Sequence, residues 1–292
     1  VVWLGAAAGA TAQENTSRTT ASPPADAEAI TPRGGTTSID TADDAQRFDD
    51  LAESVGRAPG LRLQRSGGVG APVFVTVRGS DPYHVRFVLD GIVLQGGFAT
   101  SFDLSVLPLS FIDRATVYRA AVPVQLGAPL PGGLVHLETR FGDDRVEVAA
   151  GGGSFGARRV RAIASQESGR HQWMAALSYQ GAENDFAFFD DNGTPFNRGD
   201  DAVVDRENAD VDRGALLVRH RYRGDAWRTT ALAVLTEVDR GVPGLAVVPS
   251  FATRLRSWNG WFGLRLERPR WPSDDLQVEA LVGGSVGTRR FE

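Results

Sequence analysis

Apolar and polar residues alternate through most of the chain after Arg145, and this pattern restricts the fold more than any other feature. Every second residue is small or apolar in the segments 145–150, 159–165, 172–180 and 276–282, and the residues between are polar and often Arg. A period of two indicates strands with two chemically different faces. About seven such strands follow one another, and only Ala226–Val238 has no clear polar face. The second half of the chain is therefore predicted to be a continuous antiparallel sheet.

Strands with one apolar face and one polar face are typical of a membrane barrel around a wet lumen. Short turns at Glu167–Arg170, Gly224–Asp225 and Arg268–Asp274 alternate with longer links at Ala182–Asp210 and Asp239–Ala252. Outer-membrane barrels place short turns in the periplasm and long loops outside. An aromatic girdle is predicted near the strand ends, at Trp173, Tyr179, Tyr222, Trp227 and Trp258. Any single strand also fits a soluble sandwich, but the consecutive series favours the barrel.

Composition removes several classes of protein. The formal net charge is −5, so the chain has no basic footprint for nucleic acid. No apolar run is long enough for a membrane-spanning helix. A membrane barrel is not excluded, because its strands alternate apolar and polar residues and contain no long apolar run. The chain has no cysteine, which excludes disulfides and thiolate metal sites.

The first 47 residues read as a leader and a tail. Residues 1–12 resemble the end of a secretory signal peptide, with Ala10-Thr11-Ala12 as the cleavage motif, and a short buried strand or helix is the alternative. Residues 13–47 are rich in Thr, Ser, Pro and Ala, and this composition buries too little apolar surface to fold alone. We therefore predict a flexible periplasmic tail.

Residues 48–140 carry the signals of a compact α+β domain. Asp49–Arg57 is predicted to be a short helix, and Val73–Val77 and Val85–Leu89 are predicted to form a strand pair. A second short helix is expected within 103–108, followed by strands at 115–119 and 134–139. Turn motifs punctuate these elements, at Arg78-Gly79, Asp90-Gly91 and Gly132-Gly133.

The order of these motifs resembles the plug domain of TonB-dependent outer-membrane receptors. The matching stretches are LAESVGRAPGL, PVFVTVRG, VRFVLDG, VLPLSFIDRATVY and APLPGGLVHLETR, in that order. The chain departs from the family pattern at Ala120 and Leu126, where Gly and an aromatic residue are usual. The resemblance implies a plug at 48–140 and antiparallel transmembrane strands at 145–292. Because plugged barrels have about 22 strands, it also implies that this sequence is a fragment holding about the first third of the wall.

The resemblance further implies a function. Such receptors bind a scarce nutrient (a ferric siderophore, cobalamin, haem or similar) and import it when the inner-membrane TonB protein pulls the plug. This places the protein in the outer membrane of a Gram-negative bacterium. A non-transporting binding or signalling receptor on the same fold is the alternative. The candidate for the TonB box, which pairs with TonB as an added strand, consists of Glu28, Ala29, Ile30, Thr31 and Pro32.

The sequence gives few candidates for chemistry. We predict ligand contacts at the plug apices, at Ser80, Asp81, Tyr83, His84, Gln95 and Phe98. Asp90 and other charged plug residues are predicted to pair with lumen-facing residues such as Arg219 and Arg221. The acidic segment 185–192 could hold Ca²⁺, but a solvated loop fits its spacing better. No catalytic motif or paired histidines occur, so no enzyme activity, cofactor or metal is predicted.

Overall fold

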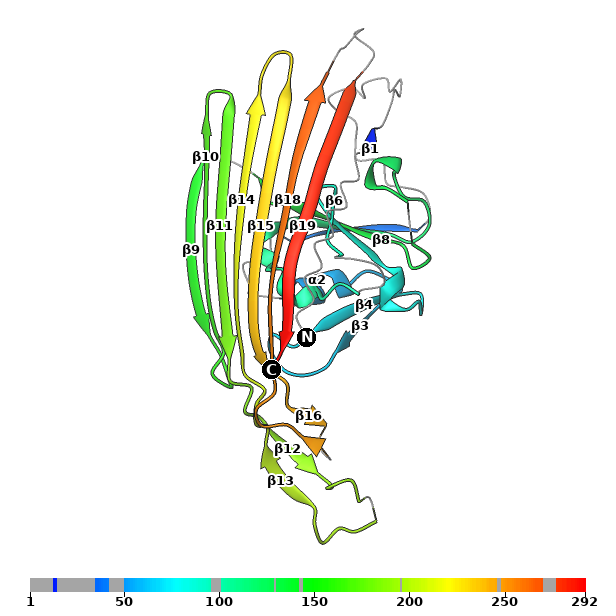
Figure 1. Ribbon diagram of the computed structural model, residues 1–292, viewed down its shortest axis with the longest axis vertical. Helices are drawn as coiled ribbons and strands as arrows, with labels where there is room; N and C mark the ends of the chain where they lie inside the picture. Colours follow the sequence, from blue (N-terminus) through cyan, green and yellow to red (C-terminus); the bar gives the residue numbers. More distant parts are fainter. Residues whose placement is uncertain are drawn as a thin grey trace.

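The structure is a computed structural model that describes residues 13–14, 35–41, 50–95, 101–128, 130–141, 144–194, 196–245, 248–269 and 277–292. Two parts lie side by side: a tall curved sheet, called here the wall, and a compact domain against one of its faces, called here the plug (Figure 1). The plug matches the predicted α+β domain and the wall matches the predicted series of strands.

The wall consists of seven long strands that pair antiparallel in chain order. They are β9 (Arg145–Gly152), β10 (Arg158–Ser168), β11 (His171–Ala182), β14 (Val211–Arg223), β15 (Arg228–Gly241), β18 (Arg254–Arg268) and β19 (Val278–Phe291). The short strand β1 (Gln13–Glu14) pairs with β19 at one edge of the sheet. Among the described residues β9 and β19 do not pair with each other, so the sheet is open.

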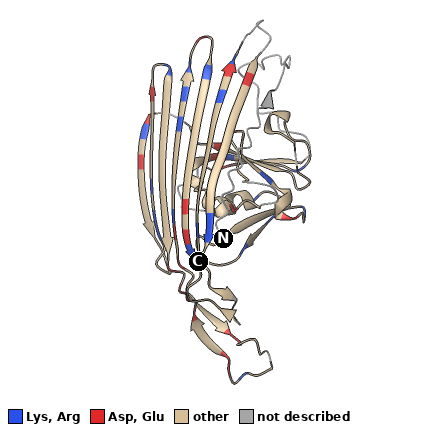
Figure 2. Ribbon diagram, in the orientation of Figure 1, with Lys and Arg blue, Asp and Glu red and all other residues tan. Residues whose placement is uncertain are grey.

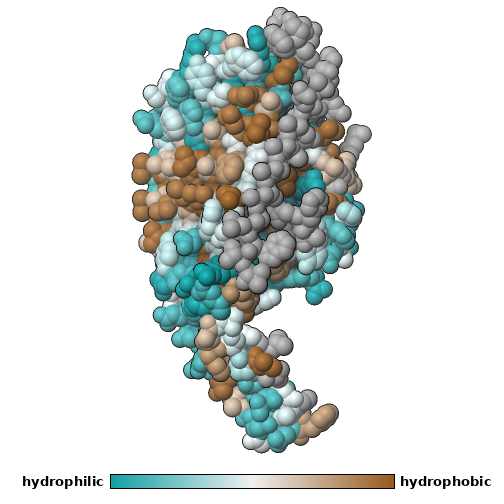
Figure 3. Space-filling model, viewed as in Figure 1, coloured by the Kyte–Doolittle hydropathy of each residue, from teal (hydrophilic) through white to brown (hydrophobic). Residues whose placement is uncertain are grey.

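The two faces of the wall follow the predicted alternation. Val148, Leu177, Leu235, Phe262 and Val282 point away from the plug and are between 48% and 70% exposed. Figure 3 shows such side chains as an apolar band, and Figure 2 shows that charged residues lie mostly towards the strand ends.

β15 lacked a clear polar face in the sequence because its inward side is apolar too. Leu232 and Val234 are buried towards the plug, whereas the outward Leu235 is exposed. An inner face that packs against a protein core need not be polar, so the alternation rule fails at this strand.

The predicted aromatic girdle lies at two levels of the outer face. Strand register aligns Tyr179 with Trp258 through Gly214 and Glu237 on the strands between them, close to the ends that carry the long links. Trp173, Tyr222 and Trp227 lie near the opposite ends, at the short turns.

The two kinds of connection lie at opposite ends of the wall, as the sequence predicts. One long link carries the hairpin of β12 (Ala187–Asp190) and β13 (Ala202–Asp205), and the other carries β16 (Gly244–Leu245) and β17 (Val248–Pro249). Both project from the same end, called here the loop end, and the β10–β11 and β14–β15 turns lie at the other (Figure 1). The short β9–β10 turn is an exception, because it lies at the loop end. No helix among the described residues is long and apolar enough to cross a membrane.

The plug is built on a mixed five-stranded sheet in the order β2-β7-β8-β5-β6. Its strands are β2 (Thr36–Asp40), β5 (Arg86–Leu89), β6 (Ile92–Val93), β7 (Ile112–Tyr118) and β8 (Leu134–Thr139), and only β5 and β8 are parallel. A separate ribbon of β3 (Leu61–Arg65) and β4 (Val73–Val77) and the helix α2 (Leu51–Gly56) complete the domain. Asp50 caps α2, and its side chain accepts a hydrogen bond from the Ala52 amide at 3.4 Å.

Two local predictions for the plug are wrong. β4 and β5 do not form a strand pair, because the 3₁₀ turn η1 (Pro82–His84) directs the chain from the ribbon into the main sheet. In place of a helix within 103–108, the chain forms the 3₁₀ turns η2 (Leu104–Val106) and η3 (Leu109–Phe111). Pro108 accounts for this break, since the residue before a proline avoids helical geometry and Leu107 is extended.

The predicted boundary between tail and plug also needs correction. β2, which was assigned to the flexible tail, pairs with β7 along five residue pairs, and the Ser38 and Thr116 hydroxyls lie 3.3 Å apart. Its β-branched residues Thr36, Thr37 and Ile39 suit a strand, and the surrounding Ser- and Pro-rich composition concealed this signal. The plug therefore begins before Phe48. Residues 1–12 and the TonB-box candidate lie outside the described residues.

Candidate functional site at the junction of plug and wall

An apolar cavity of about 490 Å³ opens at the loop end of the wall. The plug contributes the β3–β4 loop, Ser66–Pro72, which faces the two long links. The wall side supplies the base of the β12–β13 hairpin, part of the β15–β18 loop and the ends of four strands. The lining residues include Phe186, Phe188, Arg206, Val211, Arg240, Val242, Pro243, Leu255 and Phe291. A cavity of this size can hold much of a drug-sized ligand.

Glycines allow the β3–β4 loop to approach the wall closely. A Cβ on Gly68 would lie 2.6 Å from Asn184 Oδ1, and a Cβ on Gly70 would lie 2.7 Å from Val211 Cγ1. Gly70 also has φ +73°, which side-chain-bearing residues rarely adopt. The run Gly67-Gly68-Val69-Gly70 thus fits the loop into the space between the external links.

The cavity offers aromatic faces and two arginines, Arg206 and Arg240. Phe186 lies edge-on to Phe155 with ring centroids 6.1 Å apart. The Arg206 guanidinium lies 5.3 Å from the centre of the Phe188 ring, and it donates to the Gly244 carbonyl. Such a surface suits a large, mostly apolar ligand with a few polar groups.

The structure does not place the predicted apex residues at this cavity. Asp81 caps η1 by accepting from the Tyr83 amide at 3.1 Å, and Ser80 Oγ accepts from the Val77 amide at 3.3 Å. The Gly132 amide donates to the His84 carbonyl at 2.8 Å, which holds this turn against the plug itself. The apex that faces the external links is Ser66–Pro72, and its glycine run was the sequence signal that could have identified it.

Gln95 has an architectural role instead. Its Oε1 accepts from the Phe87 amide of β5 at 3.0 Å, and its Nε2 donates to the carbonyl of Val85, just before β5, at 2.5 Å. Phe98, the remaining predicted contact, lies outside the described residues.

The motif glycines occupy positions that no other residue fits well. Gly79 and Gly91 have φ of +75° and +93°. A Cβ on Gly133 would lie 2.3 Å from the Tyr118 carbonyl oxygen, and one on Gly132 would lie 2.5 Å from Ser80 Oγ. Arg78 and Asp90 precede two of these glycines and are also left-handed, so each motif forms a tight turn of two such residues.

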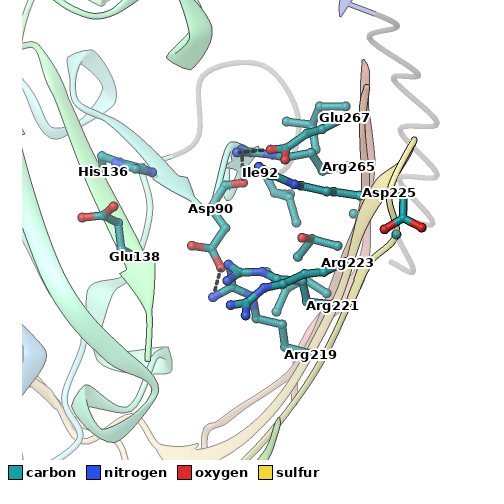
Figure 4. A pocket seen from close by; sticks show the side chains of 16 residues that line it. Asp90, Ile92, His136, Glu138, Arg219, Arg221, Arg223, Asp225, Arg265 and Glu267 are labelled. Atoms are coloured by element: carbon teal, nitrogen blue, oxygen red, sulfur yellow. Dashed lines mark hydrogen bonds and ion pairs between the residues drawn. The ribbon is translucent and has the colours of Figure 1, made fainter. Parts of the chain in front are cut away.

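A second cavity, of about 800 Å³, lies between the plug and the inner face of the wall towards the short turns (Figure 4). Its lining is charged and includes Asp90, His136, Glu138, Arg219, Arg221, Arg223, Arg265 and Glu267. Figure 4 shows Asp90 directed from the plug towards the arginines of β14. Burial lowers the pKa of His136, although Glu138 and Asp90 oppose that shift.

Asp90 is the centre of the plug contact at this charged cavity. Arg219 Nη1 lies 3.6 Å from Asp90 Oδ2 and donates to Thr139 Oγ1 at 2.6 Å, while the Thr139 hydroxyl donates to Asp90. Arg265 donates to the Asp90 carbonyl at 3.0 Å. This contact confirms the predicted pairing of Asp90 with Arg219. The other predicted arginine, Arg221, lies over the Phe141 ring at 4.3 Å, as Arg219 also does at 4.4 Å.

A buried ion pair joins plug and wall near the loop end. Arg240 of β15 donates to Asp103 Oδ2 at 3.0 Å, and both side chains are less than 10% exposed. The other carboxylate oxygen accepts from the Val73 and Ser105 amides at 3.0 Å each. Asp103 therefore fixes the start of β4, directly after the apex loop, to the wall.

Plug and wall also fit together in shape, at a notch formed by glycines of β18 and β19. Gly263 and Gly283 face each other across these strands, and Ile92 of the plug enters the space above them. A Cβ on Gly263 would lie 2.5 Å from Ile92 Cδ1. Beside this notch, Trp261 Nε1 donates to the Leu94 carbonyl at 2.9 Å.

Comparison with known proteins assigns this arrangement to a family. The family model of the TonB-dependent receptor plug domain matches residues 28–134. This chain carries a TonB-dependent receptor plug domain. A curated relative, the vitamin B12 transporter BtuB of Photobacterium profundum, is 30% identical over 188 residues. That alignment covers 63% of this chain and 29% of the relative, so the chain corresponds to less than a third of the transporter's length.

Solved receptors show the same arrangement of plug and barrel strands. The alcaligin outer-membrane receptor FauA of Bordetella pertussis aligns with a TM-score of 0.64 and 15% identity, over 90% of this chain and 40% of FauA. The siderophore receptor PirA of Pseudomonas aeruginosa gives a TM-score of 0.60 and 14% identity, over 89% of this chain and 42% of PirA. These likenesses, at 15% identity or less, show the fold of this chain.

The acidic segment on the β12–β13 hairpin does not gather into a metal site in the part of the chain that is described. Asp190 and Asp191 accept from the amides of Asn192 and Gly193, which are local turn contacts. No group of three or more His, Asp or Glu residues suited to a metal ion occurs among the described residues.

Proposed function

We propose that this protein is an outer-membrane uptake receptor that captures a nutrient at its loop end and passes it inward when the TonB energy-coupling protein pulls the plug. The observation that carries this proposal is the apolar cavity between the plug apex and the external links. The plug-domain match and the named activity of the BtuB relative support the general role.

The first ligand to test is a corrinoid such as cobalamin. The relative at 30% identity is a vitamin B12 transporter, and the aromatic lining at Phe186 and Phe188 suits a broad ligand with apolar faces. Ferric siderophores and haem form the comparison set, since structural neighbours such as PirA are siderophore receptors of much lower identity.

Ligand capture is tested on intact cells that express, in the outer membrane, the full-length receptor containing this sequence. Radiolabelled cyanocobalamin should bind saturably, and Phe188→Ala should raise the Kd by about tenfold, the loss expected when one aromatic contact worth about 1.4 kcal/mol is removed. Phe189→Ala is the matched control, because Phe189 is 63% exposed and does not line the cavity. Equal effects of the two substitutions would remove this cavity from the proposal.

Energised transport is tested separately. Deletion of Glu28–Pro32 should abolish uptake while surface binding persists, because the segment would no longer pair with TonB as an added strand. Undiminished uptake would exclude this segment as the TonB box. Binding without any energised uptake in the unaltered protein would favour the non-transporting receptor.

A further inference from the structure

Two asparagines bracket the β12–β13 hairpin at the loop end. Asn184 lies just before β12 and Asn208 just after β13, and both have left-handed backbones, with φ of 56° and 52°. Each side-chain amide forms several hydrogen bonds to the backbone of another segment. The segments that they reach are different, and this difference suggests different roles.

Asn184 joins the hairpin to the plug. Its Oδ1 accepts from the Val69 amide at 3.0 Å, and its Nδ2 donates to the Val69 carbonyl at 2.9 Å. The same Nδ2 donates to the Ala209 carbonyl at 2.9 Å, on the chain leaving the hairpin. Asn184 is only 3% exposed, and its own amide donates to the Phe155 carbonyl at 3.2 Å. The side chain thus pairs with the apex loop as a neighbouring strand would.

The apex loop is shaped around this side chain. Gly68 leaves the space that Asn184 Oδ1 occupies, since a Cβ there would lie only 2.6 Å from that oxygen. Four residues beyond Val69, the Val73 amide is held by Asp103, which Arg240 binds. A continuous path of hydrogen bonds and short chain segments therefore runs from the hairpin base through Val69 to the buried ion pair.

Asn208 provides an internal comparison because it does not reach the plug. Its Nδ2 donates to the carbonyls of Val242, Ser250 and Thr253, at 3.3, 2.9 and 3.0 Å. All three belong to the β15–β18 loop. Asn208 thus connects one external link to the other, whereas Asn184 connects an external link to the plug.

We propose that Asn184 is a positioning residue through which the β12–β13 hairpin and the plug apex loop move together. Phe186 and Phe188 lie two and four residues beyond it and line the apolar cavity, so a ligand that displaces them would shift the hairpin base. The two bonds to Val69 then transmit that shift to the plug. The ligand part of this inference rests on the proposed function, but the mechanical coupling does not.

The coupling is tested in the full-length receptor containing this sequence, expressed in the outer membrane, without ligand. These 292 residues contain no cysteine, so Val69→Cys supplies a single thiol once any cysteine elsewhere in the receptor is replaced, and the backbone groups that bind Asn184 remain. In that background Asn184→Gly, which tolerates the left-handed backbone, should raise the rate at which maleimide labels this thiol about tenfold, as expected when two net hydrogen bonds no longer hold the loop. Asn208→Gly removes an amide of similar bonding and should leave the rate unchanged.

A second measurement separates coupling from simple loosening of the loop. A short epitope inserted at the exposed hairpin tip, between Asn197 and Arg198, allows a Fab fragment to load the hairpin. The Fab should change the labelling rate of the introduced thiol when Asn184 is present and have no effect in Asn184→Gly. Equal labelling in both glycine variants, or a Fab effect that persists in Asn184→Gly, would overturn the proposal. Neither result depends on which nutrient binds, so failure of the proposed function would be recognised separately.

Discussion

The two cavities between plug and wall use neighbouring parts of the same strands but differ in chemistry. β14 contributes Val211 to the apolar cavity at the loop end and Arg219, Arg221 and Arg223 to the charged cavity towards the short turns. All four of these residues lie on the inward face of β14. The inward face therefore changes from apolar at the loop end to charged towards the short turns. An aromatic cavity suits capture of a ligand, whereas the charged cavity surrounds contacts that hold the plug against the wall.

Electrostatic contacts suit the plug movement that the proposed function requires. The attraction within a buried ion pair is largely offset by the free energy needed to remove both charges from water. The separation of two apolar surfaces, in contrast, costs free energy in proportion to their area. The Asp90–Arg219 and Asp103–Arg240 contacts can therefore specify where the plug sits without making its release very costly. Three substitutions test this contrast, in order of decreasing expected effect.

The largest effect is expected from Arg240→Ala. The substitution leaves the Asp103 carboxylate buried without its cation, which costs about 3–5 kcal/mol for a buried pair. We expect faster hydrogen exchange at the Val73 amide and a lower midpoint for plug unfolding. Arg254→Ala is the control, because Arg254 pairs with Asp210 and Asp239 at a partly exposed site of the wall, where such pairs contribute at most about 1 kcal/mol. Equal losses in the two variants would contradict a special role for the buried pair.

A smaller effect is expected at the glycine notch. Gly263→Ala places a Cβ against Ile92 Cδ1, and overpacking of this kind costs about 1–3 kcal/mol. Ile92→Ala in the same protein should recover part of that loss, because it vacates the space that the new methyl group needs. A double-mutant cycle on the thermal midpoint gives the coupling between the two positions. Additive losses would show that shape does not help to seat the plug at this cavity.

The smallest effect concerns pH at the charged cavity. Burial lowers the folded-state pKa of His136 below its unfolded value, so the unfolded plug binds more protons between the two pKa values. Stability of the plug should therefore fall as pH decreases from the unfolded pKa, near 6.5, through the folded pKa. Comparison of unfolding midpoints at neutral and mildly acidic pH measures the slope, and His136→Gln should reduce it. An unchanged slope in that variant would assign the acid sensitivity to other groups.

The sequence predicted the elements whose signal is local. Alternation identified the faces of the wall at residues such as Leu177 and Val282, and Asp50 with the following apolar residues predicted the helix α2. Pairing partners were less accessible, because whether β4 meets β5 or β3 depends on the path of η1 and on contacts distant in the chain. The edge strand β2 was missed since its five residues lie within a polar segment.

The candidate site was harder to predict than the fold. The contact of Asp90 with Arg219 was expected from the charged residues of the plug and the lumen face. The apex loop was missed because glycines carry no chemistry of their own, and the importance of Gly68 appears only when Asn184 lies beside it. Asn184 itself is an ordinary loop residue in the sequence, and its role depends on a partner 115 positions away.

The edge position of β2 has a mechanical consequence. Tension applied to the chain ahead of Gly35 reaches β2 before any other strand of the plug sheet, and among the described strands β2 has β7 as its one neighbour. An edge strand of five residue pairs can peel from Thr36 onwards, one pair at a time, so its rupture force is set by single hydrogen bonds and not by the whole sheet. The parallel pairing of β5 and β8 lies deeper and bears load only afterwards. The plug would thus yield in steps, and the work needed to open it would depend on how far the chain is drawn.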